Sequence, residues 1–349
     1  MRTEPITFEQ FMGEAQQDLQ GCLSLLYPDI RVEIQDVAKV QGESYRGLMF
    51  RRDRYLTSPV FNLQPFYEQL SSQSYEIVLA DLVEGAMDIL KKPVTIDKEE
   101  IMDYELMKKK LMTQVISAKD NAARLLELPY RQMKDMAIIY RFMLGDDGHG
   151  NMMSAMVTNA MLETYGISRE QLYADAIAAM TENHTYSIRP MGMVLSEMDP
   201  DFGEPLGPPG LYVATMDTKM YGASVITLPE FMENAAGIVK GDFYVLPSSI
   251  HEVLLLQDDG HGDPRQLQEM VESINATMLD PSDKLTDNVY HYDATERLFE
   301  TVREYTDRMA EKSMDKRPSL LKELAEQKQK MREYTPRHHR PPERSSAIL

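Results

Sequence analysis

The pentapeptide Asp-Asp-Gly-His-Gly occurs twice in this chain, at 146–150 and at 258–262, and each copy follows an apolar run. Carboxylates beside an imidazole can hold a divalent metal, so two such loops could build a paired metal or catalytic site. The candidate ligands are Asp146, Asp147, His149, Asp258, Asp259 and His261. The same residue types are common in turns, because glycine adopts positive φ and aspartate bonds its own backbone. We expect two polar loops that each cap the end of a core strand, and we keep a divalent metal as the alternative.

A second group of candidate residues is Ser249, His251 and Glu252, within Leu-Pro-Ser-Ser-Ile-His-Glu at 246–252. Serine and histidine can act as nucleophile and base, and strand alternation after the turn would place Ser249 and His251 on one face. A nucleophile elbow of the form Gly-x-Ser-x-Gly is absent from the sequence. We expect the serines to satisfy turn amides, with catalysis as the alternative.

The segment Tyr-His-Tyr-Asp at 290–293 is a third candidate, predicted to be a strand with polar partners and, as the alternative, a ligand site. The sequence contains no Gly-x-Gly-x-x-Gly, no Walker-type phosphate loop, no Cys-x-x-Cys and no kinase signature. No cofactor is therefore predicted.

Composition describes an ordinary globular protein of 349 residues, with 43% hydrophobic residues, 27% charged residues and a formal net charge of −19. The acidic balance disfavours nonspecific nucleic-acid binding by the body of the protein. The one cysteine, Cys22, lies in a helical apolar stripe, which favours a buried role and a reducing compartment. We find neither a signal peptide nor a stretch of 18 uncharged apolar residues, so we predict a cytoplasmic protein without a membrane span.

Alternating and helical apolar patterns together predict an α+β protein with mixed, mainly antiparallel sheets, packed helices and two or three subdomains. The predicted helices are 6–27, 74–91, 98–110, 169–183, 265–279 and 295–311. The predicted strands are 32–35, 44–50, 111–116, 136–144, 151–157, 211–215, 223–228, 242–246, 252–256 and 289–293. The predicted divisions are an N-terminal α+β subdomain at 1–130, a hairpin with helices at 131–198, a C-terminal α+β subdomain at 199–310, and a tail at 311–349.

The tail differs from the body in charge, since it contains ten Lys or Arg and six Asp or Glu. Residues 318–332 could form a helix, and the end at 335–342 has the composition of a disordered segment. We expect a solubilising or intramolecular tail. The alternative is that residues 312–349 contact an acidic partner or nucleic acid.

Four segments, 58–63, 135–141, 241–252 and 289–293, resemble a domain-of-unknown-function family of anaerobic Firmicutes and their mobile elements. The resemblance covers roughly residues 6–295, and Leu-Pro-Ser-Ser-Ile-His-Glu is its most specific part. It implies a cytoplasmic α+β protein, and it brings no catalytic residues with it because the family has no established activity. We therefore expect a non-enzymatic interaction or accessory protein, with a link to mobile elements and an unknown protein partner. The alternative is a hydrolase or metal-dependent enzyme that uses Ser249 and His251 or the two Asp-Asp-Gly-His-Gly loops.

Overall fold

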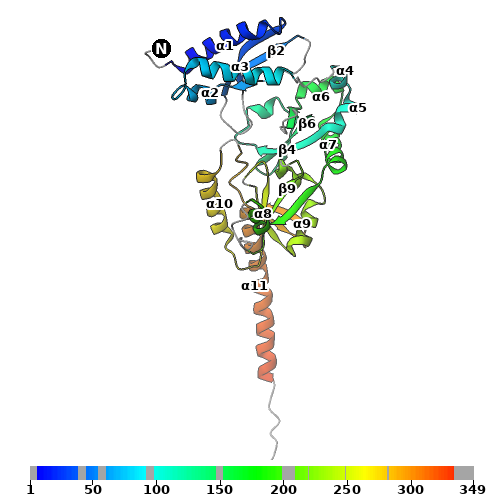
Figure 1. Ribbon diagram of the computed structural model, residues 1–349. Coiled ribbons are helices and arrows are strands. Elements are labelled where there is room, and N and C mark those ends of the chain that lie inside the picture. Colours follow the sequence, from blue (N-terminus) through cyan, green and yellow to red (C-terminus); the bar gives the residue numbers. More distant parts are fainter. Residues whose placement is uncertain are drawn as a thin grey trace, which may run out of the picture.

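The computed structural model describes residues 6–37, 45–53, 60–91, 98–146, 152–198, 209–218, 220–247, 249–280 and 283–333. In this part of the chain, helices pack on three mainly antiparallel sheets, so the predicted α+β class is confirmed (Figure 1). Each sheet has a different set of covering helices.

The N-terminal sheet has the strand order β1-β2-β3 and is covered by three helices. Its elements are β1 (Ile30–Val37), β2 (Tyr45–Arg52), β3 (Val60–Asn62), α1 (Phe8–Ser24), α2 (Gln64–Gln69) and α3 (Tyr75–Lys91). Thr7 begins α1 with a capping box, because its hydroxyl accepts from Gln10 N while the Gln10 side chain accepts from Thr7 N. The apolar stripes of α1 and α3, which include Leu19 and Leu82, are fully buried together with Phe50 of β2.

The middle sheet is built around one long strand, β6 (Met136–Asp146), which pairs with the three other strands. The other elements of this region are β4 (Leu111–Ser117), β5 (Arg131–Met133), β7 (Met152–Met156), α4 (Lys98–Met102), α5 (Tyr104–Met107), η1 (Lys108–Lys110), η2 (Arg124–Leu126), α6 (Asn159–Tyr165) and α7 (Arg169–Asn183). Alternate residues of β6, such as Tyr140 and Phe142, pack with Leu172 of α7 on one face of the sheet.

The third sheet has six strands in the order β13-β12-β10-β11-β9-β8. Its elements are β8 (Tyr186–Pro190), β9 (Leu211–Met216), β10 (Phe243–Leu246), β11 (Val253–Gln257), β12 (Tyr290–Asp293), β13 (Leu298–Thr301), α8 (Met191–Met198), η4 (Gly222–Thr227), α9 (Phe231–Val239), α10 (Pro264–Met278) and α11 (Val302–Glu333). All four residues of β10 are buried, as expected for a strand inside a sheet covered on both faces.

The middle and third sheets share one hydrophobic core, in which Met112 and Val115 of β4 join Val245 and Leu255 of the third sheet. The hydrogen-bonded sheets also cross two of the predicted divisions. β4 precedes residue 131 and pairs with β6, whereas β8 precedes residue 199 and pairs with β9. The division into subdomains therefore stays a prediction, while the packing makes these two sheets neighbours.

One predicted element is wrong in type, and another is wrong in where it begins. Residues 223–228, predicted as a strand, lie mostly in the 3₁₀ helix η4, whose residues are all buried. A short apolar run has the same composition in a buried strand and in a buried helix, so its pattern could not separate them. The predicted helix 295–311 begins only at Val302, because Leu298–Thr301 pairs with β12 as strand β13.

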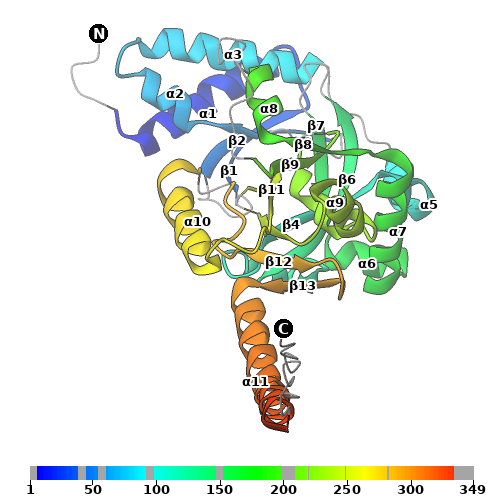
Figure 2. The same ribbon diagram turned by 90° about the horizontal axis from the view of Figure 1, so that it is seen from below.

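Helix α11 begins with a capping pair, since Glu304 N donates to Thr301 Oγ1 at 3.2 Å and Thr301 N donates to Glu304 Oε2 at 2.8 Å. The helix then runs away from the body of the molecule in both views (Figures 1 and 2). The predicted helix at 318–332 falls within α11 and is confirmed, whereas residues 335–342 lie outside the described residues. Among the described helices, none has the length and apolar character needed to cross a membrane.

Candidate functional site

The second Asp-Asp-Gly-His-Gly loop directly follows β11, as predicted, and lines a surface cleft of about 550 Å³. The cleft lies between this loop, the start of α10 and Tyr244 of β10. Asp258 Oδ1 and Asp259 Oδ1 each accept from a backbone N–H two residues ahead, at 2.9 Å, so both aspartates also shape the turn. The interpretation of this copy as a strand-ending polar loop is therefore confirmed.

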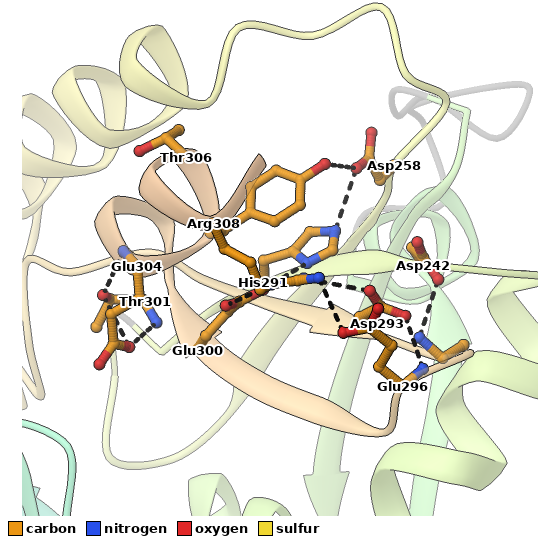
Figure 3. Close-up of polar contacts among 12 residues, drawn as sticks. Asp242, Asp258, His291, Asp293, Glu296, Glu300, Thr301, Glu304, Thr306 and Arg308 are labelled. Carbon is orange, nitrogen blue, oxygen red and sulfur yellow. Dashed lines mark hydrogen bonds and ion pairs between the residues drawn. The ribbon is translucent and has the colours of Figure 1, made fainter. Parts of the chain in front are cut away.

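Asp258 is the polar centre at the floor of this cleft. Its Oδ2 atom lies 3.2 Å from His291 Nε2 and accepts from the Tyr305 hydroxyl at 3.4 Å (Figure 3). The hydrogen bond with His291 lowers the pKa of Asp258 below its usual range. Burial and the neighbouring Asp258 carboxylate raise the pKa of Tyr244. Two residues that the sequence offered separately, Asp258 and His291, thus meet across the sheet.

His291 is fully enclosed, with 0% of its surface exposed. Its ring stacks on Tyr305 with centroids 3.8 Å apart and meets Tyr244 edge-on at 5.2 Å. The Nδ1 atom makes no hydrogen bond, although Glu300 Oε1 lies 3.9 Å away. A molecule in the cleft would therefore contact Asp258 and Tyr244 before it could reach the imidazole.

Arg308 of α11 closes this network on the other side (Figure 3). Its Nε donates to both Glu300 oxygens at 3.0 Å, and its other nitrogens reach Asp293 at 3.2 Å and Glu296 at 3.1 Å. The three carboxylates, led by the hydrogen bond to Glu300, raise the pKa of Arg308. Acidic and basic side chains therefore alternate from Asp258 through His291 and Glu300 to Arg308, and they join the start of α11 to β12 and β13.

The structure describes only one of the two loops that were predicted as metal-binding candidates. Residues 147–150 of the first copy, with Asp147 and His149, lie outside the described residues, as does the side chain of Asp146. In the part of the chain that the structure describes, no three His, Cys, Asp or Glu side chains gather as metal ligands. A shared metal between His149 and His261 stays a prediction.

The structure places Ser249, His251 and Glu252 in an irregular segment before β11, where strand alternation does not apply. Ser249 Oγ accepts from His251 N at 3.0 Å, which is the turn-amide role predicted for it. The His251 ring instead approaches Asp283, at 3.6 Å from Nε2 to Oδ1, and Glu252 is exposed. No described contact joins the Ser249 hydroxyl to the His251 ring, so the catalytic role stays a prediction without a nucleophile–base hydrogen bond.

A different surface feature was missed by the sequence analysis, namely a groove of about 700 Å³ between α1 and α3. Its apolar floor includes Leu79, Val83 and Met87, which repeat every four residues on α3 and are half-buried. Its rim carries the carboxylates Asp18, Glu76, Glu84 and Asp88 and one cation, Lys91. Because α3 already buries the stripe Val78, Leu82, Ala86 and Leu90, this second stripe gives the helix a wider apolar arc than its core contact needs.

Cys22 also lines this groove, and its side chain is exposed, contrary to the expectation of a buried cysteine. Phe11, Ala15 and Leu19, which precede Cys22 on the same apolar stripe of α1, are fully buried. Cys22 lies at the margin of that stripe, where α1 faces the groove rather than the sheet.

The fold and the sites together define an α+β protein with antiparallel sheets, a buried charge network and an open apolar groove. The chain belongs to a family of unknown function (DUF5688), whose model matches residues 8–294. This agrees with the resemblance to a family without an established activity. Comparisons with curated proteins and with solved structures give no match.

The partners of His291 were also missed, because they lie outside any local motif. Glu300, Tyr305 and Arg308 follow the matched segment, and they reach His291 only through the β12–β13 pairing and the start of α11. The one available signal was the charged Glu300 inside a short strand-like run, a residue type that is rarely buried without a partner.

Proposed function

We propose that this protein is a non-enzymatic, cytoplasmic interaction protein that binds a partner protein through the α1/α3 groove. The observation that carries the proposal is an apolar floor left open between two helices, with Leu79, Val83 and Met87 half-buried. Paired helices with an open apolar seam commonly receive a third amphipathic helix. The methionine and the small neighbours Ala80 and Cys22 leave this floor adaptable.

The partner segment that fits best is an amphipathic helix with basic flanks. The stripe from Leu79 to Met87 spans nine residues, or about 12 Å along α3, which suits two turns of a docked helix. Four carboxylates against one lysine give the rim a negative charge. Lysine or arginine beside the apolar face of the partner would complement that rim and speed encounter.

The docked helix would come from another chain. In both views α11 leaves the body on the side away from α1 and α3 (Figures 1 and 2). The basic segment of the same copy is therefore not placed along the groove within the described residues.

A designed 18-residue helix, with leucines on one face and lysines beside them, tests this proposal with the full-length protein. We expect saturable binding by fluorescence anisotropy, and we expect Glu76→Lys with Glu84→Lys to weaken it about tenfold at low salt. Asp81→Lys with Glu68→Lys is the matched control, because it changes the net charge equally at exposed sites that do not line the groove.

Two results would overturn the proposal. One is equal affinity of the groove variant and the control variant for the lysine-flanked helix. The other is equally tight binding of a helix in which glutamates replace the lysines. A helix with serines in place of the leucines should not bind, which verifies that the apolar floor contributes.

The compartment and the link to mobile elements rest on weaker support. A single cysteine in 349 residues fits a reducing cytoplasm. The resemblance of the segments at 58–63, 135–141, 241–252 and 289–293 supports the link to mobile elements. The enzymatic alternative stays a prediction, tested by metal content of the purified protein and of a His149→Ala, His261→Ala pair.

A further inference from the structure

Arg141 is a half-buried cation in the middle of β6, and its partners among the described residues are neutral. Its Nε donates to Ser154 Oγ at 2.8 Å, and its Nη1 donates to Gln114 Oε1 at 3.1 Å. Its guanidinium carbon lies 4.9 Å from the centre of the Tyr221 ring. Strands β4, β6 and β7 and the start of η4 thus converge on one guanidinium.

No carboxylate among the described residues contacts this guanidinium. Arginine carries five N–H groups, and the two bonds to Ser154 and Gln114 occupy two of them. Nη2 is not among the fully enclosed orphan atoms found in the described part of the chain. Arg141 is half-buried rather than enclosed, and the described residues offer no further hydrogen bond to its guanidinium, so N–H groups remain for a ligand.

The second observation is backbone strain at the residue that covers Arg141. Tyr221 has φ +55° and ψ +29°, the left-handed region that a bulky side chain rarely adopts. A Cβ on the next residue, Gly222, would lie 2.0 Å from Thr215 Oγ1 and 2.1 Å from the His251 carbonyl oxygen. The chain is therefore held tightly here, and the strained conformation keeps the Tyr221 hydroxyl 3.5 Å from Ser154 Oγ.

The surroundings of Arg141 disfavour its charged form. Burial lowers the pKa of Arg141, and the positive charge of nearby Arg124 acts in the same direction. Burial also lowers the pKa of Arg124, while the nearby Glu127 carboxylate acts in the opposite direction. A half-buried guanidinium is costly without a counterion, and an incoming anion would remove that cost.

We propose that Arg141, with Ser154 and Tyr221 beside it and Arg124 adding positive charge, binds an oxyanion of a small molecule, a carboxylate or a phosphate. The planar guanidinium offers parallel N–H groups that match either oxyanion in a bidentate contact. The Ser154 and Tyr221 hydroxyls stand beside it as further donors. This site is separate from the α1/α3 groove and does not depend on the function proposed for it.

Titration of the full-length protein with inorganic phosphate and, separately, with succinate tests the proposal, at constant ionic strength set by chloride. We expect one of the two to give a saturable rise in Tm and a saturable shift of the Arg141 Nε–H signal in NMR spectra. Arg141→Gln should weaken binding about tenfold to a hundredfold, because it removes charge-assisted hydrogen bonds. Arg303→Gln, an exposed arginine on α11, is the matched control.

The anion that saturates at the lower concentration identifies the source as phosphate or carboxylate. Responses to both anions that do not saturate, or responses equal in Arg141→Gln and in the wild type, would overturn the proposal. If Arg141→Gln does not fold, Tyr221→Phe and Ser154→Ala replace it. Each should weaken binding severalfold, and unchanged affinity in both would also reject the site.

Discussion

Arg308 and Arg141, two of the arginines that lie over tyrosine rings, differ in the charge of their surroundings. Arg308 lies 5.8 Å from the Tyr305 ring and bonds Glu300, Asp293 and Glu296. Arg141 lies 4.9 Å from the Tyr221 ring and bonds only neutral oxygens among the described residues. The Arg308 guanidinium is paired with carboxylates, while the described residues hold the Arg141 guanidinium in place without a counterion.

This difference separates a structural network from a candidate binding site. Around Arg308 the charges are paired within the described chain, so the network joins α11 to the third sheet. Of this network, Asp258 is the residue that lines the surface cleft. Around Arg141 the described residues supply orientation but no negative charge. A half-buried charge of this kind next to a strained tyrosine fits a site that receives a ligand better than a stabilising contact.

Removal of Arg308 should have the largest effect. Arg308→Met leaves Glu300, which is 3% exposed, without its cation, so we expect a loss of about 3 to 5 kcal/mol in the free energy of unfolding. Urea denaturation measures this loss. Arg303→Met on the same helix is the control, and equal stability of the two variants would remove the distinction between the two arginines.

Asp258→Asn should be the next most damaging change, because three partners share this carboxylate, namely His291, Tyr305 and Tyr244. We expect a loss of about 1 to 3 kcal/mol near pH 7, measured by urea denaturation. Asp259→Asn, at the neighbouring exposed aspartate, is the control, and its loss in the free energy of unfolding should be below about 1 kcal/mol.

The same carboxylate predicts a pH dependence. The pKa of Asp258 is lowered in the folded state by its hydrogen bond with His291, so acid protonates the unfolded state first. Its contribution is complete well above the ordinary aspartate value of about 3.9 and is lost as pH falls through the lower folded value. Between about pH 5 and pH 2, wild-type stability should therefore fall more steeply than that of Asp258→Asn. Parallel curves would contradict this assignment.

Arg141→Met should cost much less than Arg308→Met, because it removes a charge that has no counterion in the described structure. We expect a change within about 1 kcal/mol in the absence of phosphate and succinate. The test is urea denaturation in chloride alone. A loss as large as that of Arg308→Met would show that the fold itself depends on this guanidinium.

The smallest effect is expected from Tyr221→Phe, which keeps the ring over Arg141 and removes only the hydroxyl. Stability should change by about 0.5 kcal/mol or less, since the hydroxyl's one described contact is long, at 3.5 Å. Anion affinity should fall severalfold in the same variant. Tyr305→Phe is the comparison in the compensated network, where anion affinity should not change.

Local patterns predicted much of the secondary structure because they act over neighbouring residues. The helix predicted at 169–183 is α7 (Arg169–Asn183), and the one predicted at 74–91 is α3 (Tyr75–Lys91). Capping residues such as Ser168, whose hydroxyl accepts from Gln171 N, set such boundaries within one turn of the chain. The failure at 223–228 arose where burial on all sides removed the periodic signal.

The candidate sites depended on contacts that no local pattern encodes. The sequence singled out Asp258 and His291, but only the pairing of β10 with β11 and β12 brought them within 3.2 Å. No sequence motif marked Arg141 as a candidate site residue, because it is one charged residue in an apolar strand. The side chains that contact it belong to Gln114, Ser154 and Tyr221, which lie up to 107 positions apart in the sequence.

The sequence by itself thus determined the α+β class, most elements, the acidic body with a basic tail, and the turn role of the second Asp-Asp-Gly-His-Gly loop. Hydrophobic periodicity and turn chemistry are local properties, so they can be recognised along the chain. Only the tertiary structure decided which charges are compensated, which apolar stripe remains open between α1 and α3, and which arginine has only neutral partners among the described residues. Those outcomes depend on which distant residues share a dry environment, and that is fixed by the pairing and packing of the sheets.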